Sequence, residues 1–166
     1  MPAISLRPMN REDLHAYYRH FEQDPDVFMD MGQFAAYQYD AARVNALYDA
    51  RSRQEDRRDF FVMLGDAPIG EVCLKHIDPA NKTCELSIHL QSDAVKNRGY
   101  GSQAELLALA YAFDELQMAV VRANAVLKNK RSQHVLAKLG FEQVGQDQTF
   151  MYYQIIREVF DQLRRK

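Results

Sequence analysis

Apolar and polar side chains alternate over several short stretches of this chain, with the period of a strand that has one buried face. Turn-forming residues at 65–68 and 78–81 separate three such stretches, so we expect three consecutive antiparallel strands. On the third of them, the apolar residues at 86, 88 and 90 face one side and the polar residues Glu85 and His89 face the other. The predicted strands are residues 4–7, 60–64, 69–77, 83–90, 118–127, 141–144 and 150–156.

A helical period marks four further segments. Asn10 is a good N-cap for the first helix, which we expect to stop near Asp24 and Pro25. Asp40 caps the second, whose end is expected in the mixed-charge run 51–59, interpreted as solvated. The third helix, 102–116, is apolar or aromatic at every position from 106 to 113, which predicts that it is covered on most sides. The fourth, 131–139, ends at a glycine, and a short amphipathic tail closes the chain.

The order of these elements indicates an α/β or α+β fold, with helices on both faces of one sheet. A chain of 166 residues fits one domain, and we expect residues 1–166 to form it. No repeat, linker or low-complexity tract interrupts this pattern.

Composition and charge exclude several classes of function. A formal net charge of -2 gives no basic field for nucleic acid. The longest apolar run is too short to span a bilayer and the N-terminus has no signal-peptide pattern, so we expect no membrane association. Cys73 and Cys84 lie in predicted strands without metal-ligand spacing, which favours buried thiols, no disulfide, no structural metal and a cytoplasmic location.

The most informative stretch is the glycine loop, which we define as residues 96–102. It holds Gly99 and Gly101 directly before the apolar helix. Glycines at a helix start let backbone N–H groups converge on an anion, and the helix end adds partial positive charge. The loop is therefore predicted to hold a phosphorylated cofactor. A nucleotide-binding protein is less favoured, because neither G-x-G-x-x-G after an early strand nor G-x-x-x-x-G-K-S/T is present.

Residues 96–101, Lys-Asn-Arg-Gly-Tyr-Gly, resemble the Q/R-x-x-G-x-G/A motif of the GNAT superfamily of acyl-CoA N-acyltransferases. Residues 129–132 and 139–141 are similar to the two ends of the next helix in that family. The opening residues 6–8 resemble the branch with ribosomal-protein N-terminal and spermidine acetyltransferases. The resemblance spans nearly the whole chain.

This resemblance implies a mixed, mostly antiparallel central sheet that is splayed open where acetyl-CoA enters. Loop N–H groups would bind the CoA pyrophosphate, and the end of strand 83–90 would pair with the pantetheine amides. Lys96 stands where Gln or Arg is usual, which keeps a cation but loses bidentate geometry. The implied cofactor-binding residues are Leu90, Gln91, Lys96, Arg98, Gly99, Tyr100, Gly101, Ser102, Asn129 and Ser132.

The implied chemistry is direct attack of an amine on the acetyl thioester. An amine with a pKa near ~10.4 must lose a proton at a cost of about 4 kcal/mol at neutral pH, so a base is expected. Glu85, acting through a water, is the first candidate and His89 the second. Leu136 occupies the position of a tyrosine proposed to protonate the thiolate in many relatives, which leaves Ser132 as the candidate donor.

No sequence motif identifies the amine acceptor. A peptide N-terminus or lysine, a polyamine and an aminoglycoside-like amine all stay open, with residues 26–39 either packing on the core or forming a wall of the acceptor pocket. The sequence has no marked acidic patch of the kind that a polycation would require, so a peptide N-terminus or lysine is favoured, although acidic residues at 22, 24, 26 and 30 keep polyamines among the candidates. A non-catalytic acyl-CoA-binding regulatory domain is the alternative. The oligomeric state is also open, and a homodimer is compatible with the sequence.

Overall fold

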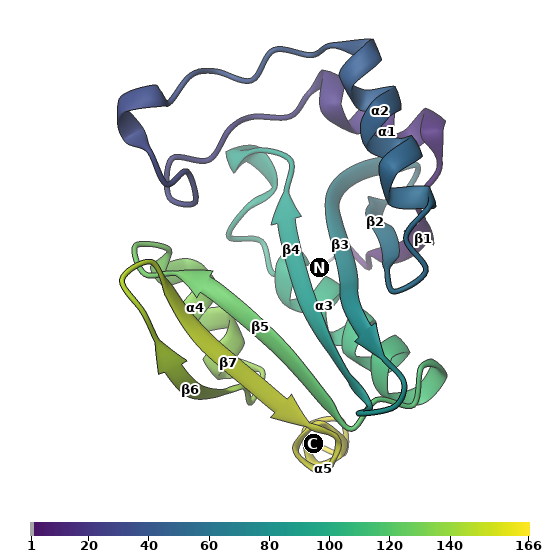
Figure 1. Ribbon diagram of the computed structural model, residues 1–166, viewed down its shortest axis with the longest axis vertical. Coiled ribbons are helices and arrows are strands. Elements are labelled where there is room, and N and C mark those ends of the chain that lie inside the picture. The colour runs from purple at the N-terminus through teal and green to yellow at the C-terminus, as the bar shows by residue number, and fades with distance from the viewer. Residues whose placement is uncertain (1) are drawn as a thin grey trace.

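The computed structural model describes residues 2–166, which form a seven-stranded sheet in the order β1-β2-β3-β4-β5-β7-β6 (Figure 1). Neighbouring strands run antiparallel except for β4 and β5, which are parallel. The predicted mixed, mostly antiparallel sheet is confirmed. The strands are β1 (Ser5–Pro8), β2 (Arg58–Leu64), β3 (Ala67–Asp78), β4 (Thr83–Leu90), β5 (Val120–Val126), β6 (Glu142–Gln146) and β7 (Phe150–Ile156).

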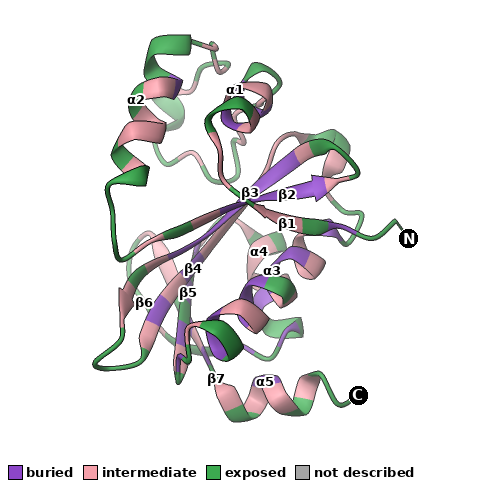
Figure 2. Ribbon diagram, turned by 90° about the vertical axis from the view of Figure 1, so that its right-hand side faces the viewer, coloured by how far each residue is buried: buried purple, intermediate pink, exposed green. Residues whose placement is uncertain are grey.

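Helices cover both faces of the sheet, as predicted (Figure 2). One face carries α1 and α2, and the other carries α3, α4 and α5. Strand β2 shows why its sequence is apolar without alternation: Phe60 and Val62 are buried under α3, while Phe61 and Met63 are buried under α1 and α2. The helices are α1 (Arg11–Arg19), α2 (Ala41–Ser52), α3 (Tyr100–Ala110), α4 (Lys130–Lys138) and α5 (Arg157–Leu163).

Strands β4 and β5 pair over only three residues, at their starts, and then diverge (Figure 1). Thr83, Cys84 and Glu85 pair with residues 120–122 of β5, and beyond Glu85 the two strands separate. Within residues 2–166, this divergence divides the sheet into a block of β1–β4 and a block of β5–β7. The segment between α1 and α2 arches over the opening.

Three sequence predictions about local structure were wrong in detail. Helix α1 ends at Arg19 rather than near Asp24, because the chain after it turns to pair with the end of β4. Helix α3 begins at Tyr100, two residues earlier than predicted, and its last turn, Tyr111–Glu115, is a π-helix. The run 51–59 is not wholly solvated, since the side chains of Arg51 and Arg57 are less than one-fifth exposed and form ion pairs.

Cys73 and Cys84 are both buried, free thiols, as predicted. Across residues 2–166, no helix is long and apolar enough to cross a membrane.

Candidate active site

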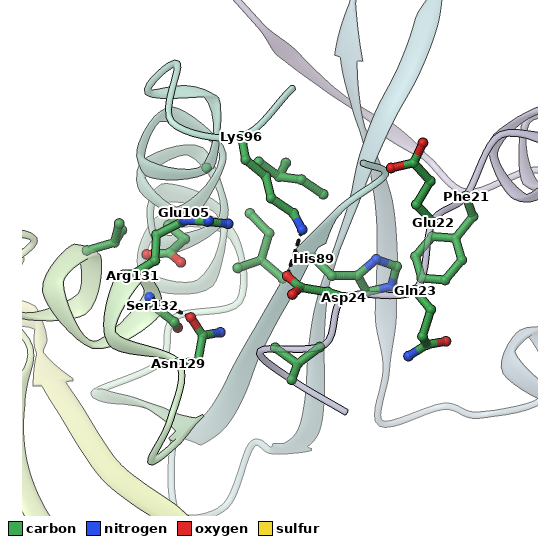
Figure 3. Close-up of a pocket in the computed structure, with 15 residues that line it drawn as sticks. Phe21, Glu22, Gln23, Asp24, His89, Lys96, Glu105, Asn129, Arg131 and Ser132 are labelled. Carbon is green, nitrogen blue, oxygen red and sulfur yellow. Dashed lines mark hydrogen bonds and ion pairs between the residues drawn. The ribbon is translucent and has the colours of Figure 1, made fainter. Parts of the chain in front are cut away.

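A cleft with a volume of about 290 Å³ lies where β4 and β5 diverge (Figure 3). Its walls come from four parts of the chain: the segment after α1, the end of β4, the glycine loop with the start of α3, and the start of α4. The sequence-predicted residues that line it are His89, Leu90, Lys96, Gly101, Asn129 and Ser132. The fold therefore brings together residues from two motifs that are about thirty positions apart in sequence.

The start of α3 has the features of an anion site. Gly99, its N-cap, has a φ of 78°, a left-handed conformation that glycine adopts without strain, and no side chain caps the helix. The first backbone N–H to bond back is that of Gln103, so the N–H groups at positions 100–102 have no partner within the helix. A Cβ on Gly101 would meet only Leu90, at 4.0 Å, so this glycine leaves open space at the cleft.

Other predicted loop residues have divided roles. The Tyr100 side chain is buried in the core, so only its backbone remains for a ligand. Arg98 is exposed. Lys96 donates to Asp24 at 2.7 Å and to Asp93 at 3.0 Å, and its side chain is 8% exposed. Lys96 therefore ties the glycine loop to the segment after α1 (Figure 3).

Gln91, directly after β4, makes three hydrogen bonds within the chain. Its N–H donates to Ile69, its carbonyl accepts from the N–H of Glu22, and its side-chain amide donates to the carbonyl of Tyr17. These bonds hold the segment after α1 against β4. Gln91 thus has a structural role, and its contact with the cofactor stays a prediction.

Helix α4 supplies the opposite wall. The Asn129 side chain accepts from the N–H of Ser132 at 3.1 Å, so Asn129 acts as the N-cap while also lining the cleft. Ser132 lines both this cleft and a smaller neighbouring cavity of about 50 Å³. Leu136, 2% exposed, lines the smaller cavity together with Ser87 of β4 and Asn124 of β5.

Glu85 lies beside this region rather than in the large cleft. Its carboxylate is 3.2 Å from the Lys75 amine and accepts from the Asn124 side chain at 3.4 Å. Glu85 is the last residue of β4 that pairs with β5, and Asn124, which contacts its carboxylate, lines the small cavity.

His89 lines the large cleft, but both of its ring nitrogens are engaged. Nε2 donates to Glu71 at 2.6 Å, and Nδ1 lies 2.7 Å from the Tyr17 hydroxyl. Glu71 is 4% exposed and also accepts from Arg51 at 2.6 Å and from the Tyr18 hydroxyl at 2.9 Å. Burial would raise the pKa of Glu71, but the positive charges of His89 and Arg51 lower it to about 2.

Two buried carboxyl groups escaped the sequence analysis: Glu71 on β3 and Glu105 on α3. Each glutamate directly precedes an apolar run, at 72–74 and at 106–113, and this neighbourhood was the sequence feature that could have indicated their burial. Glu105 lines both cavities and is 3% exposed, and burial raises its pKa to about 8. Within residues 2–166, no group of three or more potential metal ligands comes together.

Comparison with known proteins places these features in a family. The acetyltransferase (GNAT) domain family matches residues 4–142. A spermidine N(1)-acetyltransferase from Escherichia coli K12 is 27% identical over 145 residues, which cover 87% of this chain and 75% of that protein.

Solved structures share the fold. Spermidine N-acetyltransferase from Vibrio cholerae in complex with CoA and spermine superposes with a TM-score of 0.79 at 18% identity, covering 95% of this chain and 97% of that one. A dodecameric structure of the spermidine N-acetyltransferase from Vibrio cholerae superposes with a TM-score of 0.74 at 19% identity, covering 93% and 94% of the two chains.

Proposed function

This chain belongs to the GNAT family of acetyltransferases, which use acetyl-CoA, and we propose that its amine acceptor is an aliphatic polyamine. The donor site is inferred from the uncapped start of α3, which opens into the cleft at the end of β4. We assign the CoA pyrophosphate to the N–H groups of residues 100–102, with Lys96, Asn129 and Ser132 around the donor. The acetyl group would then lie where the strands diverge.

The acidic segment after α1 supports a polyamine acceptor. Glu22 lines the cleft, and Asp26 and Asp30 follow on the same exposed segment, while Asp24 also lines the cleft but is paired with Lys96 at 2.7 Å. Polyamines are flexible chains with several ammonium groups, and such carboxylates would hold the distal ones while one amine reacts. The 27% identity to a spermidine N(1)-acetyltransferase supports the same acceptor class. We also infer that the chain forms oligomers, because the structurally similar spermidine N-acetyltransferase from Vibrio cholerae is dodecameric.

An acceptor panel tests this proposal. Free CoA release is measured with acetyl-CoA and equal concentrations of spermidine, spermine, a peptide α-amine, a lysine peptide and an aminoglycoside. We expect the highest kcat/KM with a polyamine. A higher kcat/KM for any other class would overturn the acceptor assignment, and turnover with any amine rules out a purely acyl-CoA-binding role.

We further propose that Glu85 acts as the base through a water molecule, because His89 has no free ring nitrogen. The Glu85→Gln variant should lower kcat by ~10²-fold at pH 7 and by less at pH 9, where more of the amine is already neutral. The measurement is kcat against pH with saturating acetyl-CoA.

The matched control is Lys75→Met, which removes the ion pair of Glu85 but keeps its carboxylate. This variant should retain most of the activity. If the pH profile of Glu85→Gln coincides with that of the wild type, Glu85 is not the base.

A further inference from the structure

Glu105 is a buried carboxyl without a hydrogen-bond partner on one of its oxygens. Its side chain projects from α3 beside the cleft, one helical turn after Gly101 (Figure 3). Oε2 has no partner anywhere in residues 2–166. Leaving a buried polar atom unpaired is costly, so such a group calls for an explanation beyond packing.

The position of Glu105 links the two cavities. It lines the large cleft, where the donor is assigned, and also the small cavity at the point where β4 and β5 diverge. Ser132 of α4 also lines both cavities. A donor whose pyrophosphate lies at the start of α3 and whose acetyl group lies between the strands must pass Glu105.

The protonation state of Glu105 follows from its surroundings. Burial alone raises its pKa to about 8, so the group is mostly neutral at pH 7 and carries a proton that it can give. The small cavity contributes no other titratable side chain from the described residues. The charged or titratable groups that line the large cleft with it are Glu22, Asp24, His89, Lys96 and Arg131.

The neighbouring residues cannot supply the same proton. Leu136 has no acidic proton, and it occupies the wall of the small cavity. Both ring nitrogens of His89 are held by Glu71 and Tyr17. Ser132 has a hydroxyl, but a free hydroxyl is a much weaker acid than a carboxyl group. Glu105 is therefore the acid best placed in the described chain.

We propose that Glu105 protonates the CoA thiolate as it departs, directly or through the hydroxyl of Ser132. This role rests on the proposed acetyl transfer. The amine nitrogen forms a bond to the acetyl carbon, the carbon–sulfur bond breaks with its electron pair going to sulfur, and the sulfur takes the proton of Glu105. The acceptor arrives as an ammonium, and the proton that it loses before attack passes through the base to solvent. The second proton, which the nitrogen loses after attack, returns through water to the Glu105 carboxylate, so each turnover releases one proton to solvent.

The energetics favour this transfer. A thiol has an ordinary pKa of about 8.5, and a general acid works best when its own pKa lies near the working pH. An ordinary glutamate would be ionised at pH 7 and could not serve. The same burial that raises the pKa of Glu105 thus makes it fit for this step.

The test uses the isosteric variant Glu105→Gln, which keeps the shape but cannot give a proton. We expect kcat with the best acceptor to fall by ~10²-fold while the Kd of acetyl-CoA, measured by calorimetry, changes less than about twofold. The wild-type kcat should decline above about pH 8 as Glu105 ionises, and this alkaline limb should be absent in the variant. An unchanged kcat, or an alkaline limb that persists, would overturn the proposal.

Two controls separate the alternatives. If Glu105→Gln weakens acetyl-CoA binding as much as it lowers kcat, then Glu105 serves donor binding and the acid role is wrong. Glu105→Leu should have the same kcat as Glu105→Gln and should melt at a temperature no lower than that of the wild type. The difference in melting temperature should grow from pH 5 to pH 8, because only the wild type must keep a buried carboxyl group neutral. If the wild type itself acetylates no amine, the proposed function fails rather than the role of Glu105.

Discussion

Replacing Gly101 by glutamate is expected to abolish acetyl-CoA binding while leaving the fold intact. A Cβ at this position meets only Leu90, at 4.0 Å, so the backbone can accept a side chain. The new carboxylate would project from the first turn of α3 into the anion site. It would compete for the N–H groups of residues 100–102 and repel the pyrophosphate. We expect the Kd measured by calorimetry to rise by at least ~10²-fold, equivalent to about 3 kcal/mol.

The matched control is Gly145→Glu on β6, where a Cβ would meet no atom within 4 Å. It adds the same charge away from the cleft and should bind acetyl-CoA like the wild type. Gly101→Ala should give an intermediate affinity. If Gly101→Glu binds acetyl-CoA normally, the pyrophosphate does not lie at the start of α3.

The second large effect concerns stability. Glu71→Gln should lower the free energy of unfolding at pH 7 by about 3 kcal/mol, because Arg51 loses its buried counterion and His89 loses its carboxylate. Urea unfolding followed by circular dichroism gives this value. Glu55→Gln, at an exposed position in the loop after α2, is the control and should change stability by less than about 0.5 kcal/mol.

The effect of Glu71 should depend on pH in a defined direction. Its pKa is about 2 in the folded chain against an ordinary value of 4.5, so its ionisation favours the folded state. This contribution is complete above about pH 5 and is lost as the pH falls towards 2. The difference between wild type and Glu71→Gln should therefore shrink between pH 5 and pH 3. A difference that is constant over this range would show that the ion pairs of Glu71 do not stabilise the fold.

The fold could be predicted from sequence because its signals are local. Alternation in residues 83–90 predicted a strand with two distinct faces, and the two glycines of the glycine loop placed the start of α3 to within two residues. The element boundaries were less predictable. The early end of α1 depends on the hydrogen bond from Glu22 to Gln91, two residues that are far apart in the chain. No local pattern encodes such a contact.

The site was predictable only in part for a similar reason. The glycine loop carries its chemistry in the backbone, so the sequence was enough to find it. The burial of Glu71 and Glu105 was not predicted, because most glutamates lie on the surface and a single glutamate beside an apolar run does not show which element covers it. Their burial depends on which helix or strand covers them, and Glu71 becomes recognisable only once Arg51 of α2 is brought beside it.

The short pairing of β4 and β5 gives this sheet two edges in its interior. Strand edges usually invite other chains to pair with them, which is a hazard for aggregation. Here the end of β4 lines a cleft whose other walls are the segment after α1 and the starts of α3 and α4, and these elements cover the free edge. The fold can thus keep backbone N–H and C=O groups of β4 free for a slender ligand without exposing them to strands of other protein molecules.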